Sequence, residues 1–411
     1  MKVIRLKHLL KGNFGGVWGD DLDCNENSYT YILRSTEQNE NGNWVINWES
    51  VARRNLLRVT NFHTLKKNDI VITKSSGSAG HIGKATLVDE NIEKLHCSFS
   101  NFMQCLQLDA GKCNPRFYWY YLNSRHCKEQ YKISCTTSTG LLNLNSDTFN
   151  NLNVPFFSVE YQNQCVAFLD KTISKIEDAI EKHKIQLDFL SSYRQSLITR
   201  AVTKGLDGDH QTSFIPLKYL AKLNPDVEQA MSDEIEYLPM EKVKNGMFLH
   251  HSDKLANLPP SLNSFEDGDI LLAKVTPCFE NGNICLAENC KGGVGRCSTE
   301  LFVLRPNPQK VMPKFLMLLL QTQSFKQEAA CQMRGTGGLK RIPADWLCNY
   351  KFPIPSLEKQ KQIVEYMASK HSNLDGLTKI IKDSICLLND YRSSLISAAV
   401  TGQLAIEEAE E

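Results

Sequence analysis

The chain has 411 residues, of which 42% are hydrophobic and 23% charged, and its formal net charge at pH 7 is +1. This length allows two or three domains with their own cores, and the near-zero net charge restricts any basic surface to local patches. Fourteen cysteines without a CxxC pair exclude the common zinc-finger motifs and are typical of a reducing compartment, so we expect a cytoplasmic protein.

The first part of the chain reads as a mixed α/β domain. Residues 69–72 predict a short strand, a glycine-containing polar turn follows at residues 75–80, and residues 118–124 predict a helix. Arg54 lies close in sequence to two tryptophans, and Thr139 belongs to a second, glycine-containing loop. Hydroxyl and cationic side chains in such loops are typical of nucleic-acid contacts, although solvated loops have the same composition. The candidate contacts of this domain are Arg54, Lys74, Ser76, His81, Lys84 and Thr139.

A long helix is predicted next. Residues 160–204 contain neither proline nor glycine, and their apolar positions recur in steps of three and four. Such a helix is roughly 65 Å long. His183 and Arg194 occupy two seam positions, where we expect them to act as spacers. The seam residues are Val166, Leu169, Ile173, Ile176, Ile180, Leu187, Leu190 and Leu197.

The chain then repeats itself. Residues 138–203 match residues 336–401 at a constant offset of 198, without a gap. The strand at residues 67–74 matches residues 267–274 more loosely, so the first half of each module varies and the second half is constrained. A second α/β domain, with a helix predicted at residues 313–323, is therefore expected. Two copies of one module can form a molecule with approximate twofold symmetry, which suits duplex DNA.

The second long helix, residues 357–401, has a seam of similar length. We expect the two helices to pair as an antiparallel coiled coil; the alternative is that each packs on its own domain. His371 is expected to be a spacer. The seam residues are Val364, Met367, Leu374, Ile381, Ile385, Leu388 and Leu395.

The loops of the second module carry more charge than those of the first. Residues 334–341 place three cations beside glycines, where backbone can approach a phosphate closely. A polar loop after the second strand repeats the loop at Lys74. The candidate DNA contacts of this module are Lys274, Thr276, Asn281, Arg334, Lys340 and Arg341.

No catalytic constellation is recognisable. The chain lacks a glycine-rich cofactor loop after a strand and any Glu-x-Lys sequence of the kind that metal-dependent nucleases use. Cys278, Cys285, Cys290 and Cys297 have no common zinc spacing, so we expect no metal site. The N-terminus is interrupted by charge, and the longest apolar run, residues 315–320, is too short to span a membrane.

The order of these features resembles the DNA-specificity subunits of type I restriction-modification systems. The resemblance covers nearly the whole chain and rests on the glycine loops, the proline-bearing strand ends Val154-Pro155 and Phe352-Pro353, and the helix ends Tyr193-Arg194 and Tyr391-Arg392. The family usually shows Glu-Gln near the helix start, where the first copy has Asn163-Gln164. The expected domains are a first recognition domain (1–155), a first spacer helix (156–205), a second recognition domain (206–355), and a second spacer helix with an acidic tail (356–411).

The resemblance implies an α+β fold in which each recognition domain reads one half of a bipartite, asymmetric DNA target and the helices fix the gap. A rod of roughly 65 Å spans about 19 base pairs. It also implies two modification subunits that methylate adenine with S-adenosylmethionine, and restriction subunits that use ATP and Mg²⁺. The chain itself is expected to have no cofactor and no catalytic activity. Two alternatives remain: a coiled-coil scaffold with protein-binding end domains, and the specificity subunit of a related defence methylation system.

Overall fold

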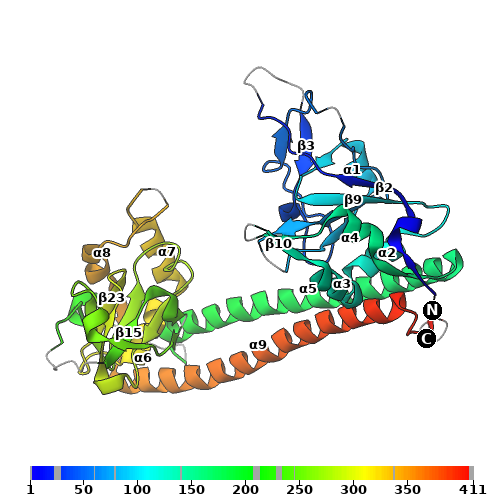
Figure 1. Cartoon of the computed structure of the whole chain (residues 1–411). Coiled ribbons are helices and arrows are strands. Elements are labelled where there is room, and N and C mark those ends of the chain that lie inside the picture. The colour runs from blue at the N-terminus through cyan, green and yellow to red at the C-terminus, as the bar shows by residue number, and fades with distance from the viewer. Residues whose placement is uncertain are drawn as a thin grey trace. The chain divides into compact units, whose positions relative to one another are not determined.

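The structure, a computed structural model, describes residues 2–22, 29–59, 61–77, 80–138, 141–206, 213–227, 234–244, 246–336 and 338–406. The chain forms two compact units (Figure 1). Unit 1 comprises residues 1–182 and 383–411, and unit 2 comprises residues 183–382. Each unit therefore contains one α/β domain and parts of both long helices.

Unit 1 is built on a four-stranded antiparallel sheet with the order β2-β9-β5-β7. Its strands are β2 (Leu10–Gly15), β9 (Met103–Leu108), β5 (Ile70–Thr73) and β7 (Ala85–Leu87). The central strand β5 is buried on both faces because its side chains alternate between two cores. Ile70 and Ile72 pack toward the helices, and Val71 packs toward a smaller sheet on the other side. The strand predicted at residues 69–72 is confirmed.

Further strands and short helices of unit 1 surround this sheet. A small sheet has the order β4-β3-β8, the hairpin β10-β11 pairs with β6, and β1 pairs with β12. The strands are β1 (Lys2–Arg5), β3 (Thr30–Leu33), β4 (Ala52–Arg54), β6 (Ser75–Ser76), β8 (Ser98–Phe99), β10 (Thr136–Ser138), β11 (Leu141–Asn143) and β12 (Asn153–Phe156). The helices are α1 (Glu90–Lys94), α2 (Pro115–Asn123), α3 (Arg125–Ser134) and α4 (Ser146–Asn151).

Unit 2 repeats this plan with a sheet of order β14-β23-β20-β21 and a second sheet of order β18-β15-β22-β19. In addition, β13 pairs with β24 and β16 with β17. The strands are β13 (Ser213–Pro216), β14 (Ala221–Leu223), β15 (Glu234–Leu238), β16 (Val243–Lys244), β17 (Met247–Phe248), β18 (Ser252–Lys254), β19 (Asn263–Glu266), β20 (Ile270–Ala273), β21 (Ile284–Leu286), β22 (Val294–Cys297), β23 (Leu301–Pro306) and β24 (Lys351–Ile354). The helices are α6 (Pro313–Leu320), α7 (Gln323–Gln332) and α8 (Ala344–Asn349).

The predicted short helices shift for local reasons. Helix α2 begins at Pro115, earlier than expected, because the Asn114 side chain caps it by accepting from the Arg116 backbone N–H at 2.8 Å. The helix expected at residues 313–323 ends earlier, at Leu320, and a further helix, α7, begins at Gln323. Thr322 caps α7 by accepting from the Phe325 backbone N–H at 3.4 Å.

The two long helices are α5 (Val159–Lys204) and α9 (Leu357–Val400). Ser158 and Ser356 precede them at the offset of 198, and each side chain accepts a backbone N–H of the first turn, at 3.2 and 3.5 Å. In unit 1 the first half of α5 shares a core with the end of α9, and in unit 2 the end of α5 shares a core with the start of α9. The helices therefore run antiparallel, and the expected α+β fold is confirmed.

The same cores contain side chains of the α/β domains. Leu169 of α5 and Leu395 of α9 belong to one cluster with Tyr118 of α2. The two packing alternatives considered from the sequence are thus combined, since each seam faces the other helix and the domain together.

Candidate nucleic-acid interface

An equivalent backbone hydrogen bond joins the two predicted polar loops in each unit. In unit 1 the Leu144 N–H donates to the Lys74 carbonyl at 2.8 Å, and in unit 2 the Ile342 N–H donates to the Lys274 carbonyl at 2.9 Å. The loop that follows the central strand is therefore fixed to the glycine loop in the same way twice. The sequence predicted both loops but not that they meet.

The glycine loop of unit 2 is a tight hairpin. Arg334 and Arg341 exchange both backbone hydrogen bonds, at 2.9 and 2.8 Å. Thr276 closes the hairpin from the neighbouring loop, because its hydroxyl accepts from the Lys340 N–H at 2.9 Å and donates to the Gly338 carbonyl at 2.8 Å. At Gly335 a Cβ atom would lie 2.3 Å from the Leu339 carbonyl oxygen, so the turn requires glycine there.

The cations of this hairpin differ in their partners. Arg334 and Lys340 are exposed. Arg341 forms a two-pronged ion pair with Glu300, at 2.8 and 3.2 Å, which lowers the pKa of the Glu300 carboxyl below its usual range. Glu300 thus orients Arg341 but also competes with any phosphate for it.

Two other predicted residues of unit 2 lie in the loop after β20. The Lys274 ammonium lies 5.4 Å from the centre of the Phe302 ring and is half-buried, whereas Asn281 is exposed. Thr276 is buried, so its part in the loop is to hold the hairpin rather than to face a ligand.

Unit 1 places its predicted residues in several environments. Lys74 is half-buried and donates to the Gln104 side chain at 3.1 Å, and burial lowers the pKa of its ammonium. Ser76 lies in β6, which pairs with the hairpin strand β11. His81 is exposed. Thr139 lies outside the described residues.

Lys84 is the prediction that the geometry does not favour. Its side chain is buried, and its ammonium donates to the Gln38 carbonyl at 3.0 Å inside the domain. The Gln38 amide in turn donates to the Val71 carbonyl at 2.9 Å. Because this cation stabilises the fold internally, we omit it from the interface.

Arg54 is half-buried beside another aromatic residue. Its guanidinium lies 4.4 Å from the centre of the Trp18 ring and forms an ion pair with Asp21. It lies on strand β4 of the small sheet, so the predicted contacts Lys74 and Arg54 lie in two different places, the joined loops and this sheet.

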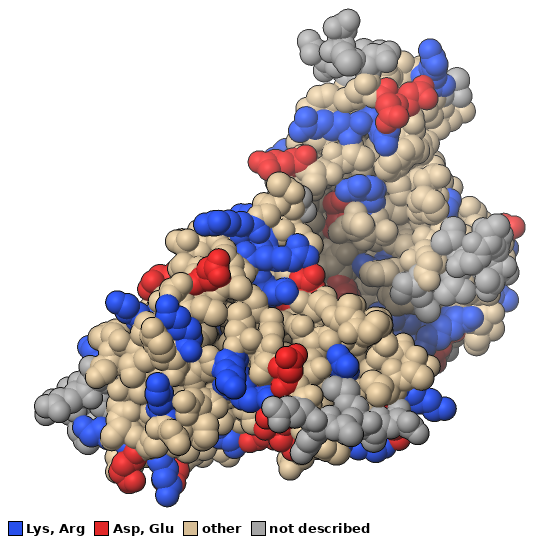
Figure 2. Space-filling model, turned by 90° about the vertical axis from the view of Figure 1, so that its left-hand side faces the viewer, with Lys and Arg blue, Asp and Glu red and all other residues tan. Residues whose placement is uncertain are grey.

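Lysine and arginine side chains form small groups on the face drawn in Figure 2, with aspartate and glutamate between them. This distribution agrees with the net charge of +1. The interface, if it binds a polyanion, depends on local groups such as the hairpin cations rather than on a continuous basic field.

The predicted helix seam is covered along its length. All fifteen seam residues are buried or half-buried, with the half-buried ones at Leu187, Leu190, Leu197, Val364, Ile381, Ile385 and Leu388. His183 and Arg194 are also half-buried. His371 is half-buried with its Nε2 atom lacking a hydrogen-bond partner among the described residues.

Comparison with known proteins decides the family. A family model described as the type I restriction modification DNA specificity domain matches residues 1–187 and 261–386, which is more than half of the chain. The chain belongs to this family. This membership favours the interpretation of the chain as a DNA-specificity subunit over the alternative of a coiled-coil scaffold.

Individual relatives are specificity subunits of type I restriction enzymes. The EcoEI subunit of Escherichia coli is 30% identical over 201 residues, which are 48% of this chain and 34% of that protein. The chain therefore matches about a third of the length of that relative. The StySPI subunit of Salmonella potsdam is 20% identical over 400 residues, 94% of this chain and 85% of that protein.

Solved structures show the same fold. A chain from a structure of complex assembly and conformational transition in the type I R-M system has a TM-score of 0.73 at 14% identity, with 98% of both chains covered. The HsdS subunit from Thermoanaerobacter tengcongensis has a TM-score of 0.52 at 14% identity, covering 98% of this chain and 97% of that one.

None of the helices within the described ranges is long and apolar enough to cross a membrane.

In each unit one glutamine of the long helix holds the specificity domain by hydrogen bonds. The sequence analysis did not predict this role. Gln162 and Gln360, 198 residues apart, are fully buried. Their side-chain oxygens accept the backbone N–H of Asn114 and Met312, each at 2.8 Å. Their amides donate to the Phe157 and Pro355 carbonyls just before the helices, both at 2.9 Å. The sequence feature that could have indicated this role is the same polar residue at both positions of the repeat, close to the apolar seam.

A buried aspartate just before the central strand has different partners in the two units. Asp69 lies 2.6 Å from His63 and also accepts from Gln107, whereas Asp269 pairs with Arg305 at 2.8 and 2.9 Å. The His63, Asp69 and Cys105 ligand atoms lie within 4.8 Å of one another. The Asp69 carboxylate already accepts hydrogen bonds from other groups of the domain.

Three cysteines of the cluster considered from the sequence lie in an apolar core of unit 2. These are Cys285, Cys290 and Cys297.

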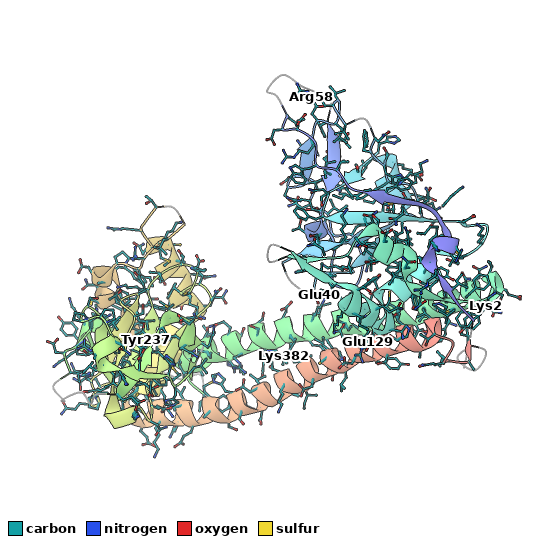
Figure 3. The ribbon with its side chains drawn as sticks, viewed as in Figure 1. Lys2, Glu40, Arg58, Glu129, Tyr237 and Lys382 are labelled. Carbon is teal, nitrogen blue, oxygen red and sulfur yellow. The ribbon has the colours of Figure 1, made fainter. Side chains whose placement is uncertain are left out.

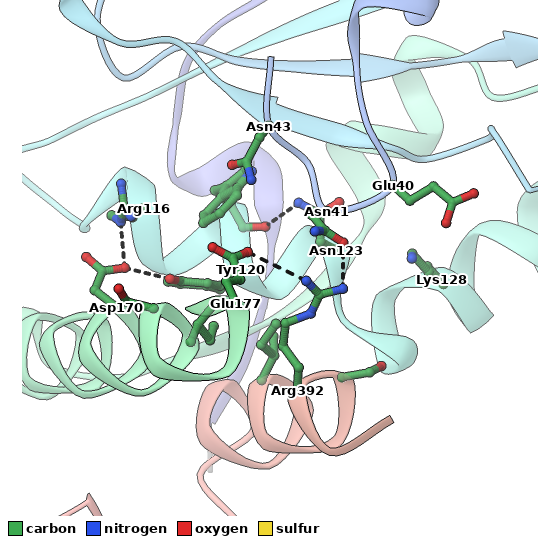
Figure 4. A pocket seen from close by; sticks show the side chains of 15 residues that line it. Glu40, Asn41, Asn43, Arg116, Tyr120, Asn123, Lys128, Asp170, Glu177 and Arg392 are labelled. Atoms are coloured by element: carbon green, nitrogen blue, oxygen red, sulfur yellow. Dashed lines mark hydrogen bonds and ion pairs between the residues drawn. The ribbon is translucent and has the colours of Figure 1, made fainter. Parts of the chain in front are cut away.

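A cavity of about 230 Å³ marks the joint between the specificity domain and the helices in unit 1 (Figure 4). Arg116 and Tyr120 bind Asp170 of α5 at 2.8 and 2.5 Å. On the other wall Arg392 of α9 donates to the Asn41 side chain at 2.5 Å and lies 3.6 Å from Glu177. The charged side chains of each wall thus have partners inside the cavity. These pairs link the domain to α5 on one wall and to α9 on the other.

Proposed function

We propose that the chain is the DNA-specificity subunit of a type I restriction-modification enzyme and that its two domains contact duplex DNA through their joined loops. The carrying observation is that the same loop junction, Lys74 with Leu144 and Lys274 with Ile342, occurs once in each repeat. A duplicated site on an antiparallel helix pair suits a target with two halves. Membership of the specificity-domain family supports this proposal.

The target is asymmetric in this proposal because the two loops differ in chemistry. The hairpin of unit 2 carries Arg334, Lys340 and Arg341, whereas residues 136–140 of unit 1 carry threonine, serine and glycine. Cations contact phosphates at every sequence, and specificity arises from other side chains in the variable halves of each module. Each domain would then read its own half-site.

The gap between the half-sites would be set by α5 and α9. Both helices enter both units without a break, and their seams are covered throughout. At about 1.5 Å per residue, one heptad of helix corresponds to about 10 Å, or roughly three base pairs. The helices therefore provide a natural spacer.

The partners in this proposal are two modification subunits and the restriction subunits. An exposed apolar pair recurs at the offset of 198, as Phe189 with Tyr193 on α5 and as Leu387 with Tyr391 on α9. Two equivalent apolar pairs suit two copies of one partner. S-adenosylmethionine would bind the modification subunits, ATP and Mg²⁺ the restriction subunits, and this chain would supply DNA recognition without a cofactor of its own.

Long-read methylome sequencing tests the proposal. The modification subunits are expressed with this chain, with a chain carrying Arg334→Ala, Lys340→Ala and Arg341→Ala together, or without it. We expect one bipartite adenine motif with the intact chain, reduced methylation of the same motif with the triple variant, and no such motif without the chain. Methylation that does not depend on the chain would refute the proposal.

A further inference from the structure

An arginine on the small sheet of unit 1 is held by aromatic rings. The Arg53 guanidinium lies 5.2 Å from the centre of the Tyr29 ring and 5.8 Å from that of Tyr31. Arg53 is exposed, and Tyr29 is 41% exposed. Such cation–π contacts restrain a long side chain while leaving its hydrogen-bonding edge in solvent.

Strand pairing produces this arrangement. Arg53 on β4 lies directly opposite Tyr31 on β3 in the antiparallel register, so both side chains are on one face of the sheet. Tyr29 is two residues before Tyr31 and shares that face, and its hydroxyl lies 3.3 Å from the Tyr31 hydroxyl. The Trp48 ring supports Tyr31 from the side, with ring centres 5.2 Å apart.

The corresponding sheet of unit 2 lacks this feature. Phe99 and Cys297 are 198 residues apart and pair with Leu33 and Leu238, which aligns β3 with β15. Counting along both ladders then places Glu236 at the position of Tyr31 and Ser252 at the position of Arg53. Glu236 is buried and accepts the His251 backbone N–H at 2.7 Å. Among the described residues, the aromatic–arginine pair therefore occurs at this position of the first module and not at the matching position of the second.

The small sheet that carries this face lies away from the long helix α5. Strand β3 and the nearby Arg58 are at the end of the unit opposite to α5, whereas Lys2 lies beside the helices (Figures 1 and 3). The neighbouring Arg54 points to the other face of β4, where it lies over Trp18 and is paired with Asp21. The contacts of Arg116 and Tyr120 with Asp170, which join the domain to α5, do not involve this face.

We propose that Arg53, positioned by Tyr29 and Tyr31, is a DNA contact of the first recognition domain that binds a planar pair of acceptors on duplex DNA. The proposal rests on the proposed function. The guanidinium presents two parallel N–H donors, which match either two oxygens of one phosphate or O6 and N7 of guanine in the major groove. A restrained guanidinium loses little side-chain entropy on binding, whereas a lysine cannot donate in this geometry.

The test measures duplex binding by the chain in complex with its modification subunits. Affinities are determined at several salt concentrations, for a duplex with the methylated motif and for a duplex of random sequence. The variants are Arg53→Ala and Arg53→Lys, with Lys132→Ala on α3 as a control that removes one exposed cation from the same unit. Tyr31→Phe, which keeps the ring, and Tyr31→Leu, which removes it, test the support, and thermal unfolding shows that each variant is folded.

Two results support the inference and identify the acceptor. For a phosphate, Arg53→Ala weakens binding to both duplexes alike and reduces the salt slope by about one. Arg53→Lys keeps the salt slope but restores only part of the affinity, because the ammonium keeps the charge and loses the two parallel donors. For guanine, Arg53→Ala and Arg53→Lys each weaken binding to the motif roughly 5- to 100-fold and relax one position of one half-site. In both cases Tyr31→Phe binds like the wild type and Tyr31→Leu binds more weakly.

The inference is overturned if Arg53→Ala matches the Lys132→Ala control in affinity, salt slope and motif. In that case the wild-type complex still binds its motif and the proposed function stands. Failure of the wild-type complex to bind any duplex would instead refute the proposed function, and with it the inference.

Discussion

Arg194 on α5 forms an ion pair with Asp375 on α9. The residues at the offset of 198, Arg392 on α9 and Glu177 on α5, form the equivalent pair in unit 1 at 3.6 Å. The sequence repeat is thus also a repeat of tertiary contacts between the helices. Each pair fixes the same antiparallel register, one in each unit.

This register predicts the effect of charge reversal. Asp375→Arg places two cations together and should destabilise unit 2 by about 1 kcal/mol, because the pair is partly exposed and like charges repel. Arg194→Asp combined with Asp375→Arg should restore the wild-type midpoint of thermal unfolding. A double variant no more stable than the two single variants taken together would mean that these residues do not interact.

His371 predicts a pH-dependent weakness in the seam of unit 2. Burial, and secondarily the charge of Arg194, lowers the pKa of His371 below its usual value. The unfolded chain therefore binds a proton more readily than the folded chain, and stability falls as pH decreases through the usual histidine value of about 6.5. The first module has the buried Ile173 at the matching position.

His371→Ile should therefore stabilise unit 2, by roughly 1–2 kcal/mol, because it removes a buried nitrogen without a partner among the described residues. It should also flatten the dependence of the unfolding midpoint on pH between about 7 and 5. His183→Ile is the matched control, at a half-buried seam position where the ring Nδ1 donates to the Gln186 side-chain oxygen at 2.9 Å. An unchanged pH profile in His371→Ile would contradict this account of the seam.

The Arg341–Glu300 pair predicts opposite effects of two substitutions on DNA binding. Arg341→Ala should weaken binding to every duplex and reduce the salt slope by about one. Glu300→Gln removes the competing charge and should strengthen binding to every duplex, by a few-fold, while leaving the motif unchanged. Gel shifts of the complex with modification subunits, over a salt series, measure both. Equal affinities for the two variants would show that this hairpin is not at the DNA.

Much of the architecture was predictable because the repeat encodes it. The constant offset between Tyr193 and Tyr391 predicts two equivalent helices, and the absence of proline and glycine from residues 160–204 predicts their length. The burial of all four β5 side chains, on alternating faces of the sheet, follows from a short apolar run between polar turns. These properties depend on local sequence and on its periodicity.

The features that the sequence did not predict depend on contacts between residues far apart in the chain. Lys84 looked like a loop cation, but its ammonium meets the carbonyl of Gln38, 46 residues away. The same applies to His63, whose proximity to Cys105 requires the folded sheet. The match between Arg53 and Tyr31 likewise depends on the register of two strands that are not adjacent in sequence. Composition cannot distinguish a solvated cation from one that is held by a partner.

The spacer role of the helices predicts a change in the target without a change in its halves. One heptad inserted after Ala179 on α5 and one after Asn389 on α9 should keep the pairing, because Glu177 lies opposite Arg392. The insertions lengthen the helix pair by about 10 Å, or roughly three base pairs. Methylome sequencing should show both half-sites unchanged and a longer gap. Altered half-sites would refute the spacer role.

Exchange of one recognition domain tests the central claim most directly. Residues 1–155 are replaced by the corresponding domain of another specificity subunit whose motif is known, with Gln162 and the rest of α5 retained to preserve the joint. The chimaera is expressed with the modification subunits, and the methylated motif is read by long-read sequencing. The account predicts that one half of the motif is replaced and that the other half and the gap stay as in the wild type. A motif that is unchanged, or that changes in both halves, would contradict the claim that each domain reads one half-site.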